Sequence, residues 1–216
     1  MRLLTNLLDY SKIEAGEMSN DTSPFSPASV ITEVTALFQS NNGAADIEVR
    51  AELNGLEDLW VLGDSQKVMQ VLTNLLSNAM KFTDAGQIEI TLQADAVSQP
   101  NPCYRIKVRD TGIGMSQTQL SKIFDAFVQL DDSDRRRYLG TGLGLSICQQ
   151  LTHLMGGELT VESTPKLGSE FTLSLPMPVA VEPESTPVGR VMTTCASNGR
   201  RIVVVEDSKP NQLVVQ

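Results

Sequence analysis

Two asparagines and a lysine recur at helical spacing in the segment NLLSNAMKFT. Asn74, Asn78 and Lys81 stand at i, i+4 and i+7, so they share one face of a helix. An asparagine oxygen is a hard, neutral ligand that Mg²⁺ accepts while phosphate oxygens complete its shell, and an ammonium neutralises phosphate charge. This face therefore suits a metal-bound polyphosphate. The alternative for these residue types is a solvated helix face.

A carboxylate follows at the end of an alternating strand pattern. Tyr104, Ile106 and Val108 alternate with polar residues, and Asp110 continues their inward parity. A carboxylate on the apolar side of a sheet needs a partner, because leaving it unpaired is strongly unfavourable. The amino group of adenine would supply such a donor. The alternative is that Asp110 caps a turn.

Two glycine clusters could bring backbone close to a nucleotide. Gly112 and Gly114 follow Asp110 directly, and the absence of a β-carbon would let the chain approach a flat base. The second cluster opens a helix, so its backbone amides and the positive helix end would be available to phosphate oxygens. Its spacing matches neither the dinucleotide fingerprint nor the P-loop. The residues expected to meet the triphosphate there are Gly140, Thr141, Gly142, Leu143 and Gly144.

The segment between the glycine clusters resembles a lid. Apolar residues recur at helical spacing over 123–128, which predicts a short helix, and the charged stretch Asp131–Tyr138 follows it. Phe124 and Phe127 are expected in the core. Arg136 is the side chain expected to reach the γ-phosphate.

These residues need an α/β framework to bring them together. Apolar periodicity predicts helices over 2–15, 30–38, 68–82 and 143–155, the third of them capped at Gly63–Ser65. Alternation predicts strands at 47–53 and 59–62, and hairpins that pair 88–92 with 104–108 and 159–161 with 171–175.

Length, composition and charge limit the class of protein. The 216 residues, 41% hydrophobic and 20% charged, suit one main globular domain with appendages. A net charge of −9 opposes nucleic-acid binding. Cys103, Cys148 and Cys195 show neither zinc nor disulfide spacing, so a reducing cytoplasm is expected. No apolar run is long enough to cross a membrane, which leaves any anchor to the full-length parent.

The order of motifs resembles the GHKL ATPase superfamily and, within it, the sensor histidine kinases. NLLSNAMKFT resembles the N box, DTGIGM the first glycine box, FDAF the F box and GTGLGLSI the second glycine box. The resemblance implies a two-layer α/β sandwich over residues 22–177, with a mixed, mostly antiparallel sheet covered by helices on one face. It also implies that Asn78, with Asn74, holds Mg²⁺, that Lys81 meets phosphate and that Asp110 binds the adenine amino group. Leu139 stands where many relatives have glycine, a departure that would stiffen the lid.

Both ends of the chain resemble parts of other domains. Residues 1–18 are similar to the end of the second helix of the family's dimerisation and phosphotransfer domain. Residues 178–199 have linker composition, and residues 200–216 resemble the opening of a receiver domain, with Glu206 and Asp207 matching its acidic pair. His153 is expected to be structural, so the acceptor histidine would come from a segment absent from this chain.

The resemblance therefore implies the ATP-binding catalytic domain of a hybrid sensor histidine kinase. It would transfer the γ-phosphoryl of Mg·ATP to a histidine in a two-component phosphorelay. The implied partners are ATP, the helices that carry the acceptor histidine, a receiver domain and a second copy of the full-length protein. The alternative is a nucleotide-binding or dimerisation module without kinase activity. Type II topoisomerases, mismatch-repair ATPases and heat-shock chaperones share the glycine boxes but not the two ends.

Overall fold

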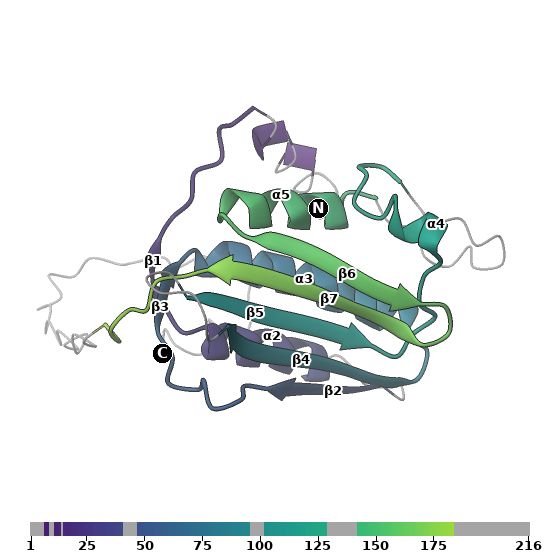
Figure 1. Cartoon of the computed structure of the whole chain (residues 1–216), viewed down its shortest axis with the longest axis horizontal. Helices are drawn as coiled ribbons and strands as arrows, with labels where there is room; N and C mark the ends of the chain where they lie inside the picture. The colour runs from purple at the N-terminus through teal and green to yellow at the C-terminus, as the bar shows by residue number, and fades with distance from the viewer. Residues whose placement is uncertain are drawn as a thin grey trace, which may run out of the picture. The chain divides into compact units, whose positions relative to one another are not determined.

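A five-stranded sheet forms one layer of the domain (Figure 1). The computed structural model describes residues 7–8, 11–13, 15–40, 47–95, 102–128 and 142–183. The strand order is β2-β4-β5-β7-β6, in which β2 pairs parallel with β4 and the other pairs are antiparallel. The mixed, mostly antiparallel sheet and both predicted hairpins are therefore confirmed. The strands are β2 (Ile47–Glu52), β4 (Gly86–Asp95), β5 (Cys103–Asp110), β6 (Glu158–Thr164) and β7 (Gly168–Pro176).

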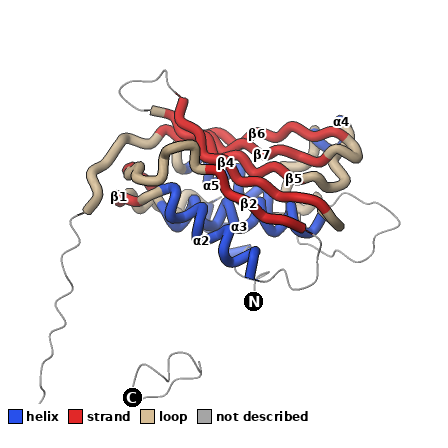
Figure 2. Tube along the Cα trace, turned by 90° about the horizontal axis from the view of Figure 1, so that it is seen from below, coloured by secondary structure: helices blue, strands red, loops and turns tan. Residues whose placement is uncertain are grey.

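Three helices cover one face of this sheet and form the second layer (Figure 2). They are α2 (Pro27–Ser40), α3 (Ser65–Phe82) and α5 (Gly144–Leu154), which confirms the three predicted helices of the domain. The apolar stripe of α3, with Leu72 and Leu75, packs in one core with inward residues of the strands, such as Ile90 and Ile106. Burying each such side chain contributes roughly 1.5–3 kcal/mol. The helix pattern of the sequence thus fixes which face of α3 remains for polar residues.

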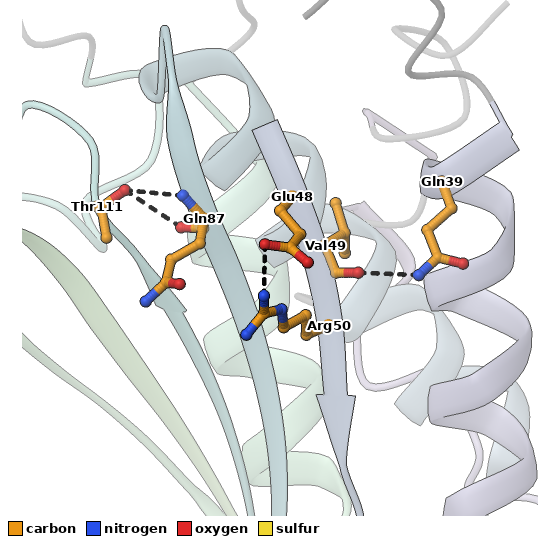
Figure 3. A network of polar contacts seen from close by, with 6 residues as sticks. All are labelled: Gln39, Glu48, Val49, Arg50, Gln87 and Thr111. Carbon is orange, nitrogen blue, oxygen red and sulfur yellow. Dashed lines mark hydrogen bonds and ion pairs between the residues drawn. The ribbon is translucent and has the colours of Figure 1, made fainter. Parts of the chain in front are cut away.

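The outer face of the sheet is polar. Arg50, Glu89, Arg109 and Glu170 are cross-strand neighbours on successive strands, so charges alternate in one row. Opposite charges facing each other across a sheet help to set its register. At the β2 edge, Gln39 Nε2 donates to the carbonyl oxygen of Val49 at 2.8 Å, which covers part of an unpaired strand edge (Figure 3).

The predicted cap of α3 is confirmed. Asp64 is the N-cap residue, and its Oδ1 accepts from Lys67 N at 3.0 Å. Its Oδ2 accepts from Asp21 N at 3.0 Å and from the Lys67 ammonium. Burial alone would raise the pKa of this carboxyl, but the hydrogen bonds from Lys67 and Asp21 hold the pKa below its usual value. The charged form is therefore the stabilising one.

Asp64→Ala is expected to lower the free energy of unfolding by about 1–2 kcal/mol through loss of the cap. The Lys67 side chain, only 12% exposed, would lose its ion pair with Asp64 and add to this loss. Because the pKa of Asp64 is lowered, its contribution is present above the ordinary carboxyl pKa and disappears as pH falls through the lowered one. Urea unfolding from pH 7 to pH 3 measures this. Asp64→Asn keeps the cap and is the matched control; equal stability of the Asp64→Ala variant and the parent would contradict the assignment.

A small second sheet joins the chain segments that enter and leave the domain. Strand β1 (Ser23–Phe25) pairs antiparallel with β3 (Val61–Gly63), and Val61 also bridges to Val179. Leu62 N donates to Pro178 O at 2.8 Å. The second predicted strand of the 47–62 region therefore forms but lies outside the main sheet.

The two ends of the chain differ in how far the structure describes them. Residues 7–8 and 11–13 are helical, and Gly16 follows with φ 66°, in agreement with the predicted N-terminal helix and its stop. The chain divides into units Met1–Pro183 and Glu184–Gln216. The receiver-like segment 200–216 belongs to the second unit and lies outside the described residues. In the described part of the chain, no helix has both the length and the apolar character needed to cross a bilayer.

Candidate functional site

Asp110 lies at the end of β5 with its carboxylate turned toward the core. It is 6% exposed, so its predicted inward orientation is confirmed. Oδ1 accepts from the backbone N of Gly112 at 2.9 Å and of Ser169 at 3.3 Å. The bond from Gly112, two residues on, is the turn cap that the sequence offered as an alternative. Both bonds go to Oδ1, so Oδ2 takes no part in them.

The electrostatic state of Asp110 follows from this environment. Burial raises the pKa of the carboxyl, and the backbone hydrogen bonds from Gly112 and Ser169 oppose that rise. A donor from a ligand would act in the same direction as these two bonds and stabilise the carboxylate further. Asp110 is therefore a hydrogen-bond acceptor whose carboxylate would be stabilised by one more donor.

Gly112 and Gly114 hold the first glycine box against protein backbone. A β-carbon on Gly112 would lie 2.3 Å from Phe82 O, the last residue of α3. Ile113 N donates to the same carbonyl at 3.2 Å. Gly114 has φ 63°, and a β-carbon there would lie 2.0 Å from Thr164 O. These glycines join the end of α3, the β5 end and the β6–β7 turn around Asp110.

Two residues near Asp110 escaped the sequence analysis. Ser169 stands opposite Asp110 in the β5–β7 register and donates its backbone N to the carboxylate. Gly168 beside it has φ 100°, and a β-carbon there would lie 1.9 Å from Asp110 O. The Gly-Ser pair at the start of a strand was the signal available. Thr83 was also missed, and within the described residues its buried Oγ1 has no hydrogen-bond partner.

The polar face of α3 is half-buried, which disfavours the solvated-face alternative for Asn74, Asn78 and Lys81. Asn74 Oδ1 lies 4.0 Å from the position of a β-carbon on Gly144, at the start of α5. Lys81 Nζ lies 4.9 Å from the centroid of the Phe82 ring, and burial lowers the pKa of the lysine. The structure thus brings the first asparagine of the N box to the second glycine box.

The start of α5 has the chemistry of an anion site. Its first turn contains no acidic residue, and Gly142 precedes it with φ 69°. Among the described residues outside α5's own backbone, the one atom within 4 Å of a β-carbon on Gly144 is Asn74 Oδ1, at 4.0 Å. Leu143, 1% exposed, anchors this turn in the core through its side chain. Exposed amides at a helix N-terminus bind phosphate oxygens readily.

The predicted helix over 123–128 is wrong. The helix of this region is α4 (Gln117–Leu120), and residues 121–127 form turns. Phe127 N donates to Gly142 O at 3.0 Å, with Phe127 at φ 65°, so a long-range bond replaces helical pairing. Phe124 packs against the core as expected, but Phe127 is 62% exposed, so its predicted burial is wrong.

Three predicted site residues cannot be placed. Arg136, Gly140 and Thr141 lie outside the described residues, as does Leu139. The described members of the site are Asn74, Asn78, Lys81, Asp110, Gly112, Gly114, Gly142, Leu143 and Gly144.

Comparison with known proteins identifies the family to which this chain is similar. The profile described as histidine kinase-, DNA gyrase B-, and HSP90-like ATPase matches residues 63–179. The signal transduction histidine-protein kinase BarA of Escherichia coli K12 is 34% identical over 100% of this chain and 23% of its own length. The sensor protein GacS of Pseudomonas syringae is 38% identical over 84% of this chain and 20% of its own. The chain thus spans about a fifth of the relatives' length.

A solved structure agrees with the sequence relatives. Full-length ShkA, crystallised in complex with AMPPNP, superposes with a TM-score of 0.73 at 28% identity, covering 84% of this chain and 36% of ShkA. Since the family profile also matches more than half of the 216 residues, the chain belongs to the histidine kinase-, DNA gyrase B-, and HSP90-like ATPase family.

Proposed function

We propose that this chain is the ATP-binding catalytic domain of a hybrid sensor histidine kinase. It prepares the γ-phosphoryl group of Mg·ATP for transfer to a histidine carried by the dimerisation and phosphotransfer helices. The observation that carries the proposal is the position of Asn74 Oδ1 beside the start of α5, 4.0 Å from the β-carbon position of Gly144. A hard oxygen ligand and an anion-binding helix end at one place suit a metal-bound triphosphate.

The adenine end of the nucleotide is assigned to Asp110. Its carboxylate is buried, has a raised pKa and uses Oδ1 for two backbone bonds. An adenine amino group donating to this carboxylate would offset part of the cost of burying its charge. Gly112 and Gly114 keep the surrounding loop close to α3, which holds the acceptor in place before the base arrives.

The phosphate end is assigned to α3 and α5. Asn78 and Asn74 would hold Mg²⁺, Lys81 would meet phosphate, and the amides of Gly140, Thr141, Gly142, Leu143 and Gly144 would seat the triphosphate, with Arg136 reaching it from the lid. When bound, Mg²⁺ would supply positive charge that neutralises the charge developing on the phosphoryl group during transfer. Burial lowers the pKa of Lys81, and a phosphate beside its ammonium would raise that pKa again.

The relatives named above, a signal transduction histidine-protein kinase and a sensor protein, support a proposal for the wider setting. We place this domain in a cytoplasmic phosphorelay, within a homodimeric full-length protein that also carries a receiver domain. Residues 1–18 would join it to the phosphotransfer helices and residues 178–199 to the receiver that begins at 200–216.

Asn78→Ala is expected to remove most of the Mg²⁺-dependent gain in nucleotide affinity, about tenfold. Binding of a fluorescent ATP analogue, with and without Mg²⁺, measures this. Gln93→Ala removes an amide from the outer face of β4 and is the matched control. Parent-like Mg²⁺ dependence in a folded Asn78→Ala variant would remove the asparagine from the metal site.

A second assay separates the kinase from a plain binding module. Labelled ATP is incubated with this chain and a separately supplied dimerisation and phosphotransfer domain of a relative. A labelled histidine is expected. Nucleotide binding that never leads to labelling, with every acceptor domain tried, would favour the module.

A further inference from the structure

We propose that Ser163 is a positioning residue for recognition of the base. Its hydroxyl holds the two backbone donors that orient the Asp110 carboxylate, and through them it sets the preference of the site for a purine with an amino group at position 6. The inference rests on the proposed function, since this orientation matters for the base only if Asp110 binds adenine.

Ser163 belongs to a row of polar residues on the inner face of the sheet. Asp110 on β5 stands opposite Ser169 on β7, and Ser169 stands opposite Ser163 on β6. Asp110 and Ser169 are buried and Ser163 is half-buried. Two residues further along, the same face is apolar, with buried Val108 opposite buried Phe171. The alternation of each strand therefore turns these three polar side chains to the inner face, at the end of the sheet where the site lies.

The hydrogen-bonding capacity of the Ser163 hydroxyl is fully used. Oγ donates to Gly168 O at 2.8 Å and accepts from Met115 N at 2.8 Å. It also lies 3.0 Å from Ser169 Oγ. A serine hydroxyl has one proton and two lone pairs, so, with its proton given to Gly168, it accepts from Ser169. One donor and two acceptor positions thus join three separate groups of the protein.

The bond to Met115 anchors the first glycine box. Met115 ends the DTGIGM segment, and the bond from its backbone N to Ser163 Oγ ties this segment to β6. Gly112, in the same segment, donates its backbone N to Asp110 Oδ1 at 2.9 Å. Because the segment is short, holding Met115 limits how far Gly112 can move. Ser163 therefore restrains the loop that carries the first donor to Asp110.

The other two bonds hold the strand that carries the second donor. Ser169 N donates to Asp110 Oδ1 at 3.3 Å. Ser163 Oγ binds the side chain of Ser169 and the carbonyl oxygen of Gly168, the residue before it. Gly168 lies against β5, because a β-carbon on it would be 1.9 Å from Asp110 O. One hydroxyl thus positions both donors, although Ser163 stands two strands away from Asp110 in the sheet (Figure 1).

The two donors on Oδ1 decide where Oδ2 points. The χ2 torsion of an aspartate is soft, so hydrogen bonds set the plane of its carboxylate. With Oδ1 held from two sides, Oδ2 of Asp110 keeps one direction, in which it would accept from the amino group of adenine. A 6-oxo purine, as in inosine triphosphate, would place an acceptor against this acceptor. Loosened donors would let the carboxylate turn, and the site would discriminate less between the two bases.

The test measures binding of ATP, inosine triphosphate and inorganic tripolyphosphate by calorimetric titration with Mg²⁺ present. The parent is expected to prefer ATP over inosine triphosphate about a hundredfold. Ser163→Ala should lower this ratio about five- to twentyfold and leave the affinity for tripolyphosphate unchanged. Ser163→Thr keeps a hydroxyl and should restore the ratio to within about threefold of the parent. Ser174→Ala is the matched control, because Ser174 is a half-buried serine on the outer face of β7.

A second readout needs no nucleotide. Hydrogen exchange of the Met115 amide, followed in ¹⁵N–¹H spectra, should become about tenfold faster in Ser163→Ala and stay parent-like in Ser163→Thr and Ser174→Ala. A parent-like preference for ATP in folded Ser163→Ala overturns the proposal, and so does equal weakening of all three ligands. If that variant does not fold, Ser163→Gly takes its place. A parent without any preference for ATP contradicts the proposed function instead, while Met115 exchange still decides whether the hydroxyl anchors the loop.

Discussion

Asp110→Asn is expected to reduce affinity for ATP about a hundredfold or more while leaving the domain folded. Asparagine Oδ1 can still accept from the backbone of Gly112 and Ser169, so the local fold is retained. Its NH₂ group must then occupy the place of Oδ2. There it would face the adenine amino group, donor against donor, and leave both without an acceptor.

The same substitution makes a prediction about stability and pH. The pKa of Asp110 is raised by burial, so its contribution to stability is fully present below the ordinary carboxyl pKa and is lost as pH rises through the raised one. Asparagine has no charge to bury. The Asp110→Asn variant is therefore expected to gain stability relative to the parent as pH rises from 4 toward 7, which urea unfolding across that range measures.

Asp95→Asn serves as the control for the charge change, because Asp95 lies at the other end of β4 from the site and is partly exposed. It should leave nucleotide binding unaltered. Retained ATP binding by folded Asp110→Asn would show that this carboxylate does not bind the base.

Gly144→Ala is expected to weaken phosphate binding without lowering the stability of the domain. Among the described residues, a β-carbon at Gly144 meets Asn74 Oδ1 at 4.0 Å, an ordinary contact, and alanine is favoured over glycine in a helix by about 1 kcal/mol. The domain should be at least as stable as the parent. The methyl group would fill the space through which phosphate reaches the α5 amides, so ATP affinity should fall about tenfold or more.

Adenosine gives the matching ligand control. It lacks phosphate, so its binding through Asp110 should survive Gly144→Ala. Gly112→Ala is the contrasting variant: its β-carbon would lie 2.3 Å from Phe82 O, so stability and the binding of both ligands should fall together. Calorimetric titration with ATP and with adenosine, beside thermal unfolding, measures the two affinities and the stability of each variant. Equal loss of adenosine and ATP in Gly144→Ala would mean that this glycine does not act through phosphate.

Local periodicity was enough to predict much of the site. The period of two along β5 turns Asp110 inward with Tyr104 and Val108, and this parity needs no knowledge of neighbouring strands. The helical period likewise separates the Leu72 stripe of α3 from the Asn74 face. In both cases the position of a side chain follows from its own element.

Contacts between distant segments could not be predicted in this way. Ser169 meets Asp110 because β7 pairs with β5 in one register, across 59 residues of chain. Phe127 leaves its predicted helix because Gly142, further along the chain, accepts its backbone N–H. Each depends on which elements become neighbours, and the spacing of residues within one element carries no information on that.

The two segments that tether the domain both attach at β3, so a rotation there would move the far end of the domain through the largest distance. The chain enters through β1 and leaves through Pro178–Ala180, on either side of the same short strand. Strand β5 runs from this end of the domain to the other (Figure 1). Cys103 pairs with Pro176 at the near end, whereas Asp110 ends β5, about 23 Å away along an extended strand. A rotation of about 10° at the tethers would sweep the nucleotide end through roughly 4 Å at that radius, more than the length of a hydrogen bond.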